Sequence, residues 1–246
     1  MTTTPEYHNY LVKTAKDTWR SELDSLEYSD DGYELIHIPH GQGKYIIPEG
    51  VRSINLKGFH FLGSVWRVEL PSTLEKIGEI APLYDCQEII NHSPNFIFEN
   101  GVLYNADKTE LIMVFERAIE SDDFTAETVV KIRDFAFSSC DNLEIIELPE
   151  SVREIGSHAF YAMQSLQSVS IPDGVTTIRE STFALCPELT HIDLPDTVTA
   201  IEPDAFLYCE KLTECDYFLR HPELQMHLWK SGSEKLITSF AHSVLF

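Results

Sequence analysis

Hydrophobic residues in this chain recur at a fixed interval of 23 residues. Isoleucine, phenylalanine, leucine and proline each form a column with this step, and the columns keep one register. Their members are Ile132, Ile155, Ile178 and Ile201; Phe137, Phe160, Phe183 and Phe206; Leu143, Leu166, Leu189 and Leu212; and Pro149, Pro172 and Pro195. The same step links Pro48 to Pro71 and Ile54 to Ile77. Columns in register indicate a repeat protein, in which we count six units.

Each unit is predicted to contain one strand and one outer segment. Residues 189–195 carry apolar side chains at the first, fourth and sixth places, the L-x-x-L-x-L pattern of a strand lining the inner face of a leucine-rich repeat horseshoe. From Ile155 to Leu166 the apolar spacing is helix-like, which predicts a short helical or irregular turn on the outer side. Because neither element can bury its apolar face alone, stacking of the units must supply the core.

An insertion interrupts the repeat between Ile77 and Ile132, which are 55 residues apart, 32 more than one period. Two short apolar runs flank Asn100-Gly101, a dipeptide that strongly favours a tight hairpin. A third apolar run follows at 111–115. We therefore expect a three-stranded meander that projects from the stack.

Both ends of the chain are predicted to be caps that hide the open edges of the solenoid core. Residues 6–22 have helical spacing and 35–38 form an extended run, while 221–229 and 235–244 read as two short helices. The predicted fold class is α+β, a right-handed leucine-rich-repeat solenoid of 23-residue units with a β-hairpin or meander insert and terminal caps. As one continuous domain it divides into an N-terminal cap of helix plus hairpin (1–47), two repeats (48–93), the meander insert (94–126), four regular repeats (127–217) and a C-terminal helical cap (218–246).

The repeat unit resembles that of a known family. Read from Leu189 to Cys209, it follows L-x-x-I-x-L-P-x-x-V-x-x-I-x-x-x-A-F-x-x-C, which is similar to the BspA-like leucine-rich repeat. The segment from Ser93 to Asn105 is similar to the hairpin found between repeats in the same family, and the resemblance spans residues 30–217. It implies extracellular adhesion and protein binding in bacteria of mucosal and gut habitats.

Composition and charge narrow the classes of partner. With 43% hydrophobic and 11% aromatic residues, the chain has the composition of a folded protein. Eighteen Lys and Arg against forty Asp and Glu give a net charge of −22, which repels nucleic acid and anionic membrane surfaces. The expected partner is a protein, possibly a basic one, and the oligomeric state is left open with a monomer favoured.

The expected location depends on the N-terminus. No apolar stretch is long enough to span a bilayer, and Met1 to Pro5 lacks the basic and apolar regions of a signal peptide. As written, the sequence predicts a cytoplasmic protein, and a cell-surface or secreted one if the N-terminus is truncated.

No residues form a recognisable catalytic, metal or cofactor site. All five cysteines occupy predicted core positions, where a free thiol behaves as a small hydrophobe: Cys86, Cys140, Cys186, Cys209 and Cys215. His37 and His40 are three residues apart but lack the Cys or carboxylate cluster that a metal site requires. No G-x-S-x-G motif or phosphate-binding loop is present. We expect no cofactor, no metal and no enzymatic activity.

The inner face is the candidate binding surface. In each L-x-x-L-x-L strand the third and fifth side chains point away from the core, since strand side chains alternate. The candidate partner-binding residues are Trp66, Arg67, Glu69, Glu147, Ser168, Ser170, His191, Asp193, Glu214 and Asp216. Acidic residues dominate the fifth place, which predicts a docking strip for a basic or hydrogen-bonding protein partner. An ordinary solvated face, in a structural or self-associating spacer, is the alternative.

Overall fold

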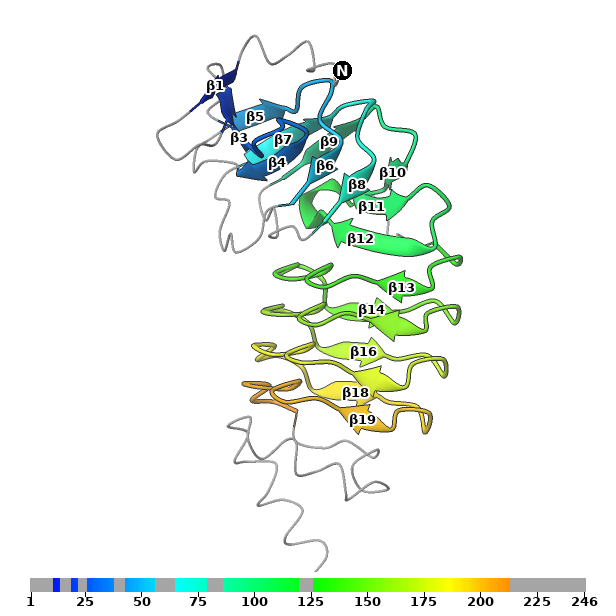
Figure 1. Ribbon diagram of the computed structural model, residues 1–246. Coiled ribbons are helices and arrows are strands. Elements are labelled where there is room, and N and C mark those ends of the chain that lie inside the picture. Colours follow the sequence, from blue (N-terminus) through cyan, green and yellow to red (C-terminus); the bar gives the residue numbers. More distant parts are fainter. Residues whose placement is uncertain are drawn as a thin grey trace, which may run out of the picture.

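The repeating units stack into a column of short parallel strands, with a larger β-rich part at the N-terminal end (Figure 1). The computed structural model describes residues 11–13, 19–21, 26–37, 43–55, 65–78, 86–119 and 126–212. The strands before the insertion are β1 (Leu11–Lys13), β2 (Trp19–Ser21), β3 (Glu27–Tyr28), β4 (Glu34–His37), β5 (Gly43–Ile46), β6 (Ser53–Ile54), β7 (Val65–Leu70), β8 (Lys76–Ile77) and β9 (Glu88–Asn91). Those that follow are β10 (Phe96–Glu99), β11 (Val102–Asn105), β12 (Glu110–Val114), β13 (Lys131–Ile132), β14 (Ile145–Glu147), β15 (Glu154–Ile155), β16 (Ser168–Ser170), β17 (Thr177–Ile178), β18 (His191–Asp193) and β19 (Ala200–Ile201).

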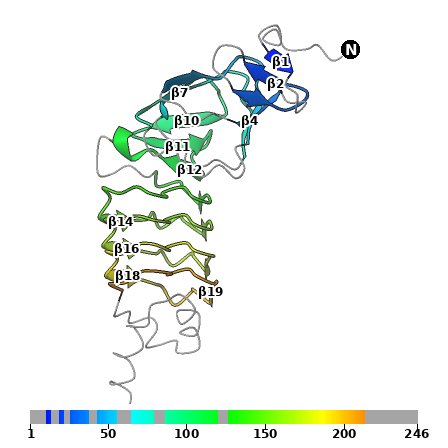
Figure 2. The same cartoon turned by 90° about the vertical axis from the view of Figure 1, so that its left-hand side faces the viewer.

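Each regular repeat contributes one strand to each of two walls. The strands predicted to line the inner face, β14, β16 and β18, form one parallel sheet, which we call the candidate wall. The opposite wall contains β13 paired with β15, and β17 paired with β19, again in parallel. Figure 2 shows β14, β16 and β18 along one side of the column and β19 on the other. The same division continues upstream, where β5, β7 and β9 form one parallel sheet and β4, β6 and β8 another.

The phenylalanine column is the centre of the core, as the repeat predicted. Phe137, Phe160, Phe183 and Phe206 are each at most 1% exposed. Neighbouring rings stack with centroid separations of 4.9, 5.0 and 5.5 Å along the column. The isoleucine and leucine columns line the same hydrophobic cluster, apart from Leu143, which packs against it partly buried.

The predicted outer helices are absent from the described repeats, so the α+β class is not confirmed: the described chain is a β-solenoid with almost no helix. Its one described helix is η2, a short 3-10 turn at Glu116–Ala118. Two columns of residues in the outer segments adopt left-handed backbone angles that an α-helix cannot contain. They are Phe135, His158, Ser181 and Asp204, with φ of 53–60°, and Ser139, Ala162, Leu185 and Tyr208, with φ of 58–61°.

Hydrogen bonds between turns explain why this conformation replaces the helix. The amide of Phe160 donates to the carbonyl of Thr182 at 2.9 Å, and that of Phe183 donates to Ala205 at 2.8 Å. These bonds join each outer segment to the next repeat, whereas a helix would bond its amides within itself. The apolar spacing from Ile155 to Leu166 therefore predicted correctly which side chains are buried, but the helix predicted from it is wrong.

The insertion is a meander, as predicted, but it does not project from the stack. β10, β11 and β12 pair in antiparallel order, and β12 then pairs in parallel with β13 of the first regular repeat. Asn100 and Gly101 form its turn with φ of 45° and 74°. Because β12 continues the opposite wall, the meander is an integral layer of the solenoid.

The meander buries side chains on both of its faces. Val102, Tyr104 and Leu111 pack into the hydrophobic cluster of the regular repeats. Leu103 and Ile112, together with other meander residues, pack into a second cluster that belongs to the N-terminal part. The insertion therefore lies between the two hydrophobic cores and contributes side chains to each of them.

The N-terminal cap also differs from its prediction. Strands β1 and β2 lie within the predicted helix 6–22 and pair with each other in antiparallel order. β2 then pairs with β3, and β3 with β4, so the cap extends the sheet of β4, β6 and β8. Strand pairing satisfies backbone groups at the sheet edge that a helix would leave open. The predicted C-terminal helices lie outside the described residues.

Candidate functional site

The candidate wall presents two rows of side chains to solvent. Its buried middle row, Ile146, Val169 and Ile192, is at most 3% exposed and anchors the three strands to the core. On either side of it the strands place side chains in register: Ile145, Ser168 and His191 in one row, and Glu147, Ser170 and Asp193 in the other. All six are exposed except Ser168, which is half-buried. The predicted alternation is confirmed at these positions.

The second row carries two carboxylates with a serine between them. Glu147 and Asp193 lie on strands two rungs apart, roughly 9.6 Å by the usual strand spacing. At that separation in water their repulsion is about 0.4 kcal/mol. In water the repulsion within this row is therefore small. Within the described residues neither carboxylate forms an ion pair.

The row of Ile145 adds an apolar feature that the sequence-based list of site residues omitted. Ile145 is 65% exposed, the highest value among the large exposed hydrophobic residues of the described chain. Its position in the third place of an L-x-x-L-x-L strand was the available signal. An exposed isoleucine beside a carboxylate row allows a partner to gain both apolar burial and charge pairing.

The remaining candidate residues lie elsewhere. Trp66, Arg67 and Glu69 belong to β7, in the separate sheet of β5, β7 and β9. Trp66 is the extra residue where the register between β5 and β7 shifts, and it is 44% exposed. Such bulges re-aim side chains. The other two predicted site residues, Glu214 and Asp216, lie outside the described residues.

The charges on β7 are neutralised within the sheet. Arg67 Nη1 lies 3.2 Å from a Glu88 carboxylate oxygen. Glu69 lies 3.1 Å from His92 Nε2 and 3.9 Å from Lys44 Nζ. The predicted site thus separates into two groups. The charged residues on β7 are paired with neighbouring residues, whereas the two carboxylates of the candidate wall are not paired within the described residues.

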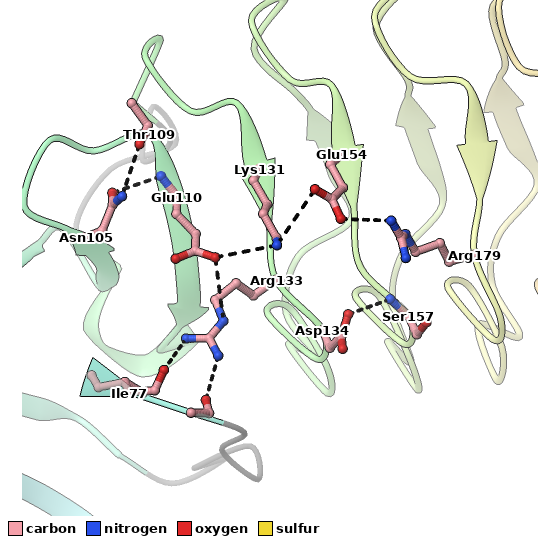
Figure 3. Close-up of polar contacts among 11 residues, drawn as sticks. Ile77, Asn105, Thr109, Glu110, Lys131, Arg133, Asp134, Glu154, Ser157 and Arg179 are labelled. Atoms are coloured by element: carbon pink, nitrogen blue, oxygen red, sulfur yellow. Dashed lines mark hydrogen bonds and ion pairs between the residues drawn. The ribbon is translucent and has the colours of Figure 1, made fainter. Parts of the chain in front are cut away.

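The opposite wall is also self-paired. Along it Glu110, Lys131, Glu154 and Arg179 alternate in charge (Figure 3). Successive members are joined by ion pairs of 3.9, 3.7 and 2.8 Å. The paired charges of this ladder contrast with the carboxylates of the candidate wall, which are unpaired in the described part of the chain.

The described residues contain no group of three or more His, Cys, Asp or Glu side chains that could hold a metal ion. His37 lies at the end of β4, and its predicted companion His40 lies outside the described residues. No helix in the described part of the chain has the length and apolar character that a membrane crossing requires.

The cysteines pack as core residues. Cys86, Cys140, Cys186 and Cys209 are buried free thiols, and Cys215 lies outside the described residues. The Cys186 and Cys209 sulfurs lie 3.1 and 3.0 Å from the carbonyl oxygens of Phe160 and Phe183. Burial raises the pKa of Cys86 to about 11 and that of Cys140 well above its ordinary value.

We expect the four described thiols to react slowly with iodoacetamide in the folded protein and rapidly after unfolding. Both burial and the raised pKa of Cys86 and Cys140 suppress the reactive thiolate. Mass spectrometry of native and denatured protein after timed alkylation measures this. Rapid labelling in native buffer, or a mass showing a disulfide between Cys186 and Cys209, would contradict the core assignment.

Comparisons with known proteins agree with this architecture. A family model described as the BspA type leucine-rich repeat region matches six copies, over residues 42–106 and 114–231. No curated protein matches the sequence significantly.

Solved structures of bacterial leucine-rich repeat proteins are similar to this chain. A leucine-rich cell surface protein from Faecalibacterium prausnitzii is 28% identical with a TM-score of 0.56, covering 68% of this chain and 51% of its own. The pneumococcal vaccine antigen PcpA is 20% identical with a TM-score of 0.59, covering 68% and 49%. A leucine-rich repeat protein from Eubacterium ventriosum is 24% identical with a TM-score of 0.57, covering 69% and 53%. This chain therefore spans about half the length of each.

Proposed function

Because the chain belongs to the BspA-type leucine-rich repeat family, we propose that it is a non-enzymatic scaffold whose candidate wall docks a protein partner. The partner is expected to present basic side chains, and its apolar contact is Ile145. A role at the cell surface, in adhesion or interaction, is supported by the similarity to the F. prausnitzii cell surface protein.

One observation carries the proposal: Glu147 and Asp193 lie in one strand row beside exposed Ile145 and form no ion pair within the described residues, while the opposite wall and β7 neutralise their charges internally. Both carboxylates lie on rigid strands anchored by buried Ile146 and Ile192. Fixed surface charges of one sign attract oppositely charged partners during the encounter. Together they form an acidic surface whose backbone is already positioned, so that binding must order only the side chains.

The test is a double variant, Glu147→Gln and Asp193→Asn, measured against a partner captured from the native host on immobilised wild-type chain. We expect the association rate to fall about threefold at low salt, because rim charges act mainly on the encounter. The wild-type rate should also fall more steeply as salt rises. Surface plasmon resonance over a salt series measures both effects.

The matched control is Glu180→Gln with Glu210→Gln, which removes the same charge from the turns. Both residues are exposed and neither side chain forms an ion pair within the described residues. Glu188 is unsuitable because it pairs with Lys211. Equal slowing in both double variants would assign the effect to net charge and contradict a local docking surface.

The second candidate function is a structural or self-associating spacer. The open-ended stacking of repeats supports it, since such units can also pack end to end. Light scattering over a range of concentrations distinguishes the two functions. A constant monomer mass supports a docking scaffold, and a mass that grows with concentration supports a spacer.

A further inference from the structure

The opposite wall is interrupted where the meander enters. β8 ends the sheet of β4 and β6, and the next sheet begins with the meander strands. Arg133 bridges the interruption: its guanidinium donates to the carbonyl oxygens of Ile77 at 2.8 Å and Gly78 at 2.6 Å (Figure 3). The interruption leaves a space beside β8.

That space is an open pocket of about 630 Å³, which we call the junction pocket. Its size is typical of sites for small ligands and far exceeds what one ion needs. Its lining comes from β8, β10, the turn after β11, β12 and Arg133, and consists of Glu75, Lys76, Ile77, Asn95, Phe96, Asn105, Ala106, Asp107, Glu110, Ile112 and Arg133. The pocket is therefore lined both by the N-terminal part, through β8, and by the meander and the first regular repeat.

The polar groups of the junction pocket have more vacant acceptors than donors. Asp107 accepts from the Thr109 amide and hydroxyl through Oδ1, and its Oδ2 accepts no hydrogen bond of ordinary geometry from the described residues. Glu110 contacts Lys131 and Arg133 through Oε1, and its Oε2 forms no hydrogen bond or ion pair within the described residues. The Asn95 side-chain amide donates to the carbonyl oxygen of Leu74, and within the described residues its Oδ1 accepts no bond.

The donors are fewer. Two nitrogens of the Arg133 guanidinium are bonded to backbone carbonyls and its third faces Glu110. Asn105 uses both ends of its amide, on Thr109 and on the Glu110 amide. Lys76 is exposed and forms no ion pair within the described residues. A complementary ligand is therefore rich in donors and positively charged, with an acceptor within reach of Lys76.

The arrangement does not suit a metal ion or a free anion. The carboxylates of the junction pocket do not converge into a metal-binding group, since the described residues contain none. Among the described lining residues an anion would meet Asp107 and Glu110, with Lys76 as the one cation whose nitrogen is not already bonded. The pocket requires a ligand with positively charged donors for the carboxylates and an acceptor for Lys76. An extended peptide has both, because a Lys or Arg side chain supplies the charged donors and the backbone carbonyls supply acceptors.

We propose that the junction pocket binds a basic side chain of an extended peptide segment. Its head contacts the vacant oxygens of Asp107 and Glu110, its methylene stem lies along Phe96 and Ile112, and a neighbouring carbonyl accepts from Lys76. The pocket lies on the opposite wall, so this site is separate from the candidate wall. The two proposals can therefore be tested independently.

The probe is the blocked tripeptide acetyl-Gly-Arg-Gly-amide, titrated into ¹⁵N-labelled full-length chain and followed through the side-chain amide signals of Asn95 and Asn105. We expect saturable shifts of both signals. The same peptide with citrulline in place of arginine keeps the shape and removes the charge. It should bind at least about threefold more weakly, the upper part of the range for an exposed ion pair.

Two variants test the pocket itself. Asp107→Asn with Glu110→Gln should weaken binding of the arginine peptide by up to about tenfold while keeping the turn acceptor at position 107. Ala106→Trp, at an exposed rim residue, should block binding sterically without changing charge. Unchanged far-UV circular dichroism and thermal unfolding establish that each variant is folded.

The control is Glu147→Gln with Asp193→Asn on the candidate wall, which should leave the tripeptide affinity unchanged. Equal affinity for the arginine and citrulline peptides, undiminished binding by the pocket variants, or no saturable shift at millimolar peptide would each overturn the proposal. Loss of affinity in the candidate-wall variant would place the binding there instead.

Discussion

Phe160→Ala is expected to lower the free energy of unfolding by about 3–5 kcal/mol, the usual cost of truncating a buried phenylalanine. The ring of Phe160 is fully buried and stacks on Phe137 at 4.9 Å and on Phe183 at 5.0 Å. Its removal leaves a cavity bordered by two other repeats. Because each repeat is stabilised mainly by its neighbours, the loss should spread to both sides.

Urea unfolding measures the loss of stability, and amide hydrogen exchange locates it. Exchange should quicken in the repeats of Phe137 and Phe183 as well as in that of Phe160. Tyr208→Ala is the matched control, because Tyr208 also occupies an outer turn but is 52% exposed. If both variants lose similar stability, the phenylalanine column does not stabilise the hydrophobic core as inferred.

The repeat register was predictable because it depends on burial alone. A column of phenylalanines in step with isoleucines and leucines must face a common interior, whatever the backbone does between them. The local conformation was not predictable in the same way. Residues such as His158 and Ala162 take left-handed angles while their amides donate to carbonyls of the next repeat. Hydrogen bonding between repeats is a tertiary effect that helical spacing within one unit cannot reveal.

The position of the meander could have been inferred from the sequence. A projecting meander would alternate apolar and polar residues, with one face in water. The run from Leu111 to Phe115 is instead apolar at every place, the pattern of a strand buried on both faces. In the structure these side chains divide between two hydrophobic clusters. The continuous run was the signal that the insertion lies inside the stack.

The candidate wall was predictable only in part. Alternation placed Glu147, Ser170 and Asp193 outward, and the parallel register put them in one row. Which charges are already paired depends on contacts between strands. Arg67 and Glu88, for example, lie 21 residues apart in sequence yet form an ion pair across β7 and β9. The junction pocket depends on how the insertion meets β8, which no periodic pattern encodes.

Arg133→Met is expected to cost about 2–4 kcal/mol, since it removes two hydrogen bonds from a charged donor and leaves two backbone carbonyls without that partner. Arg133 is 21% exposed at its side chain and donates to Ile77 and Gly78, which precede it by 56 and 55 residues. It therefore links the N-terminal core to the regular repeats. Methionine keeps much of the length and apolar stem of arginine, so the loss should report the polar bridge rather than a cavity.

The bridge should also affect how the two cores unfold together. In wild-type chain we expect a single urea transition, and in Arg133→Met a broader one with the N-terminal part unfolding first. Lys131→Met is the matched control, because Lys131 lies on β13 two residues before Arg133, is 44% exposed and within the described residues forms only the longer ion pairs of 3.9 and 3.7 Å. Its loss should stay below about 1 kcal/mol. Arg133→Lys should recover part of the stability, because lysine can keep one of the two hydrogen bonds. If Arg133→Met loses no more stability than Lys131→Met, the bridge does not link the two cores and the meander alone holds them together.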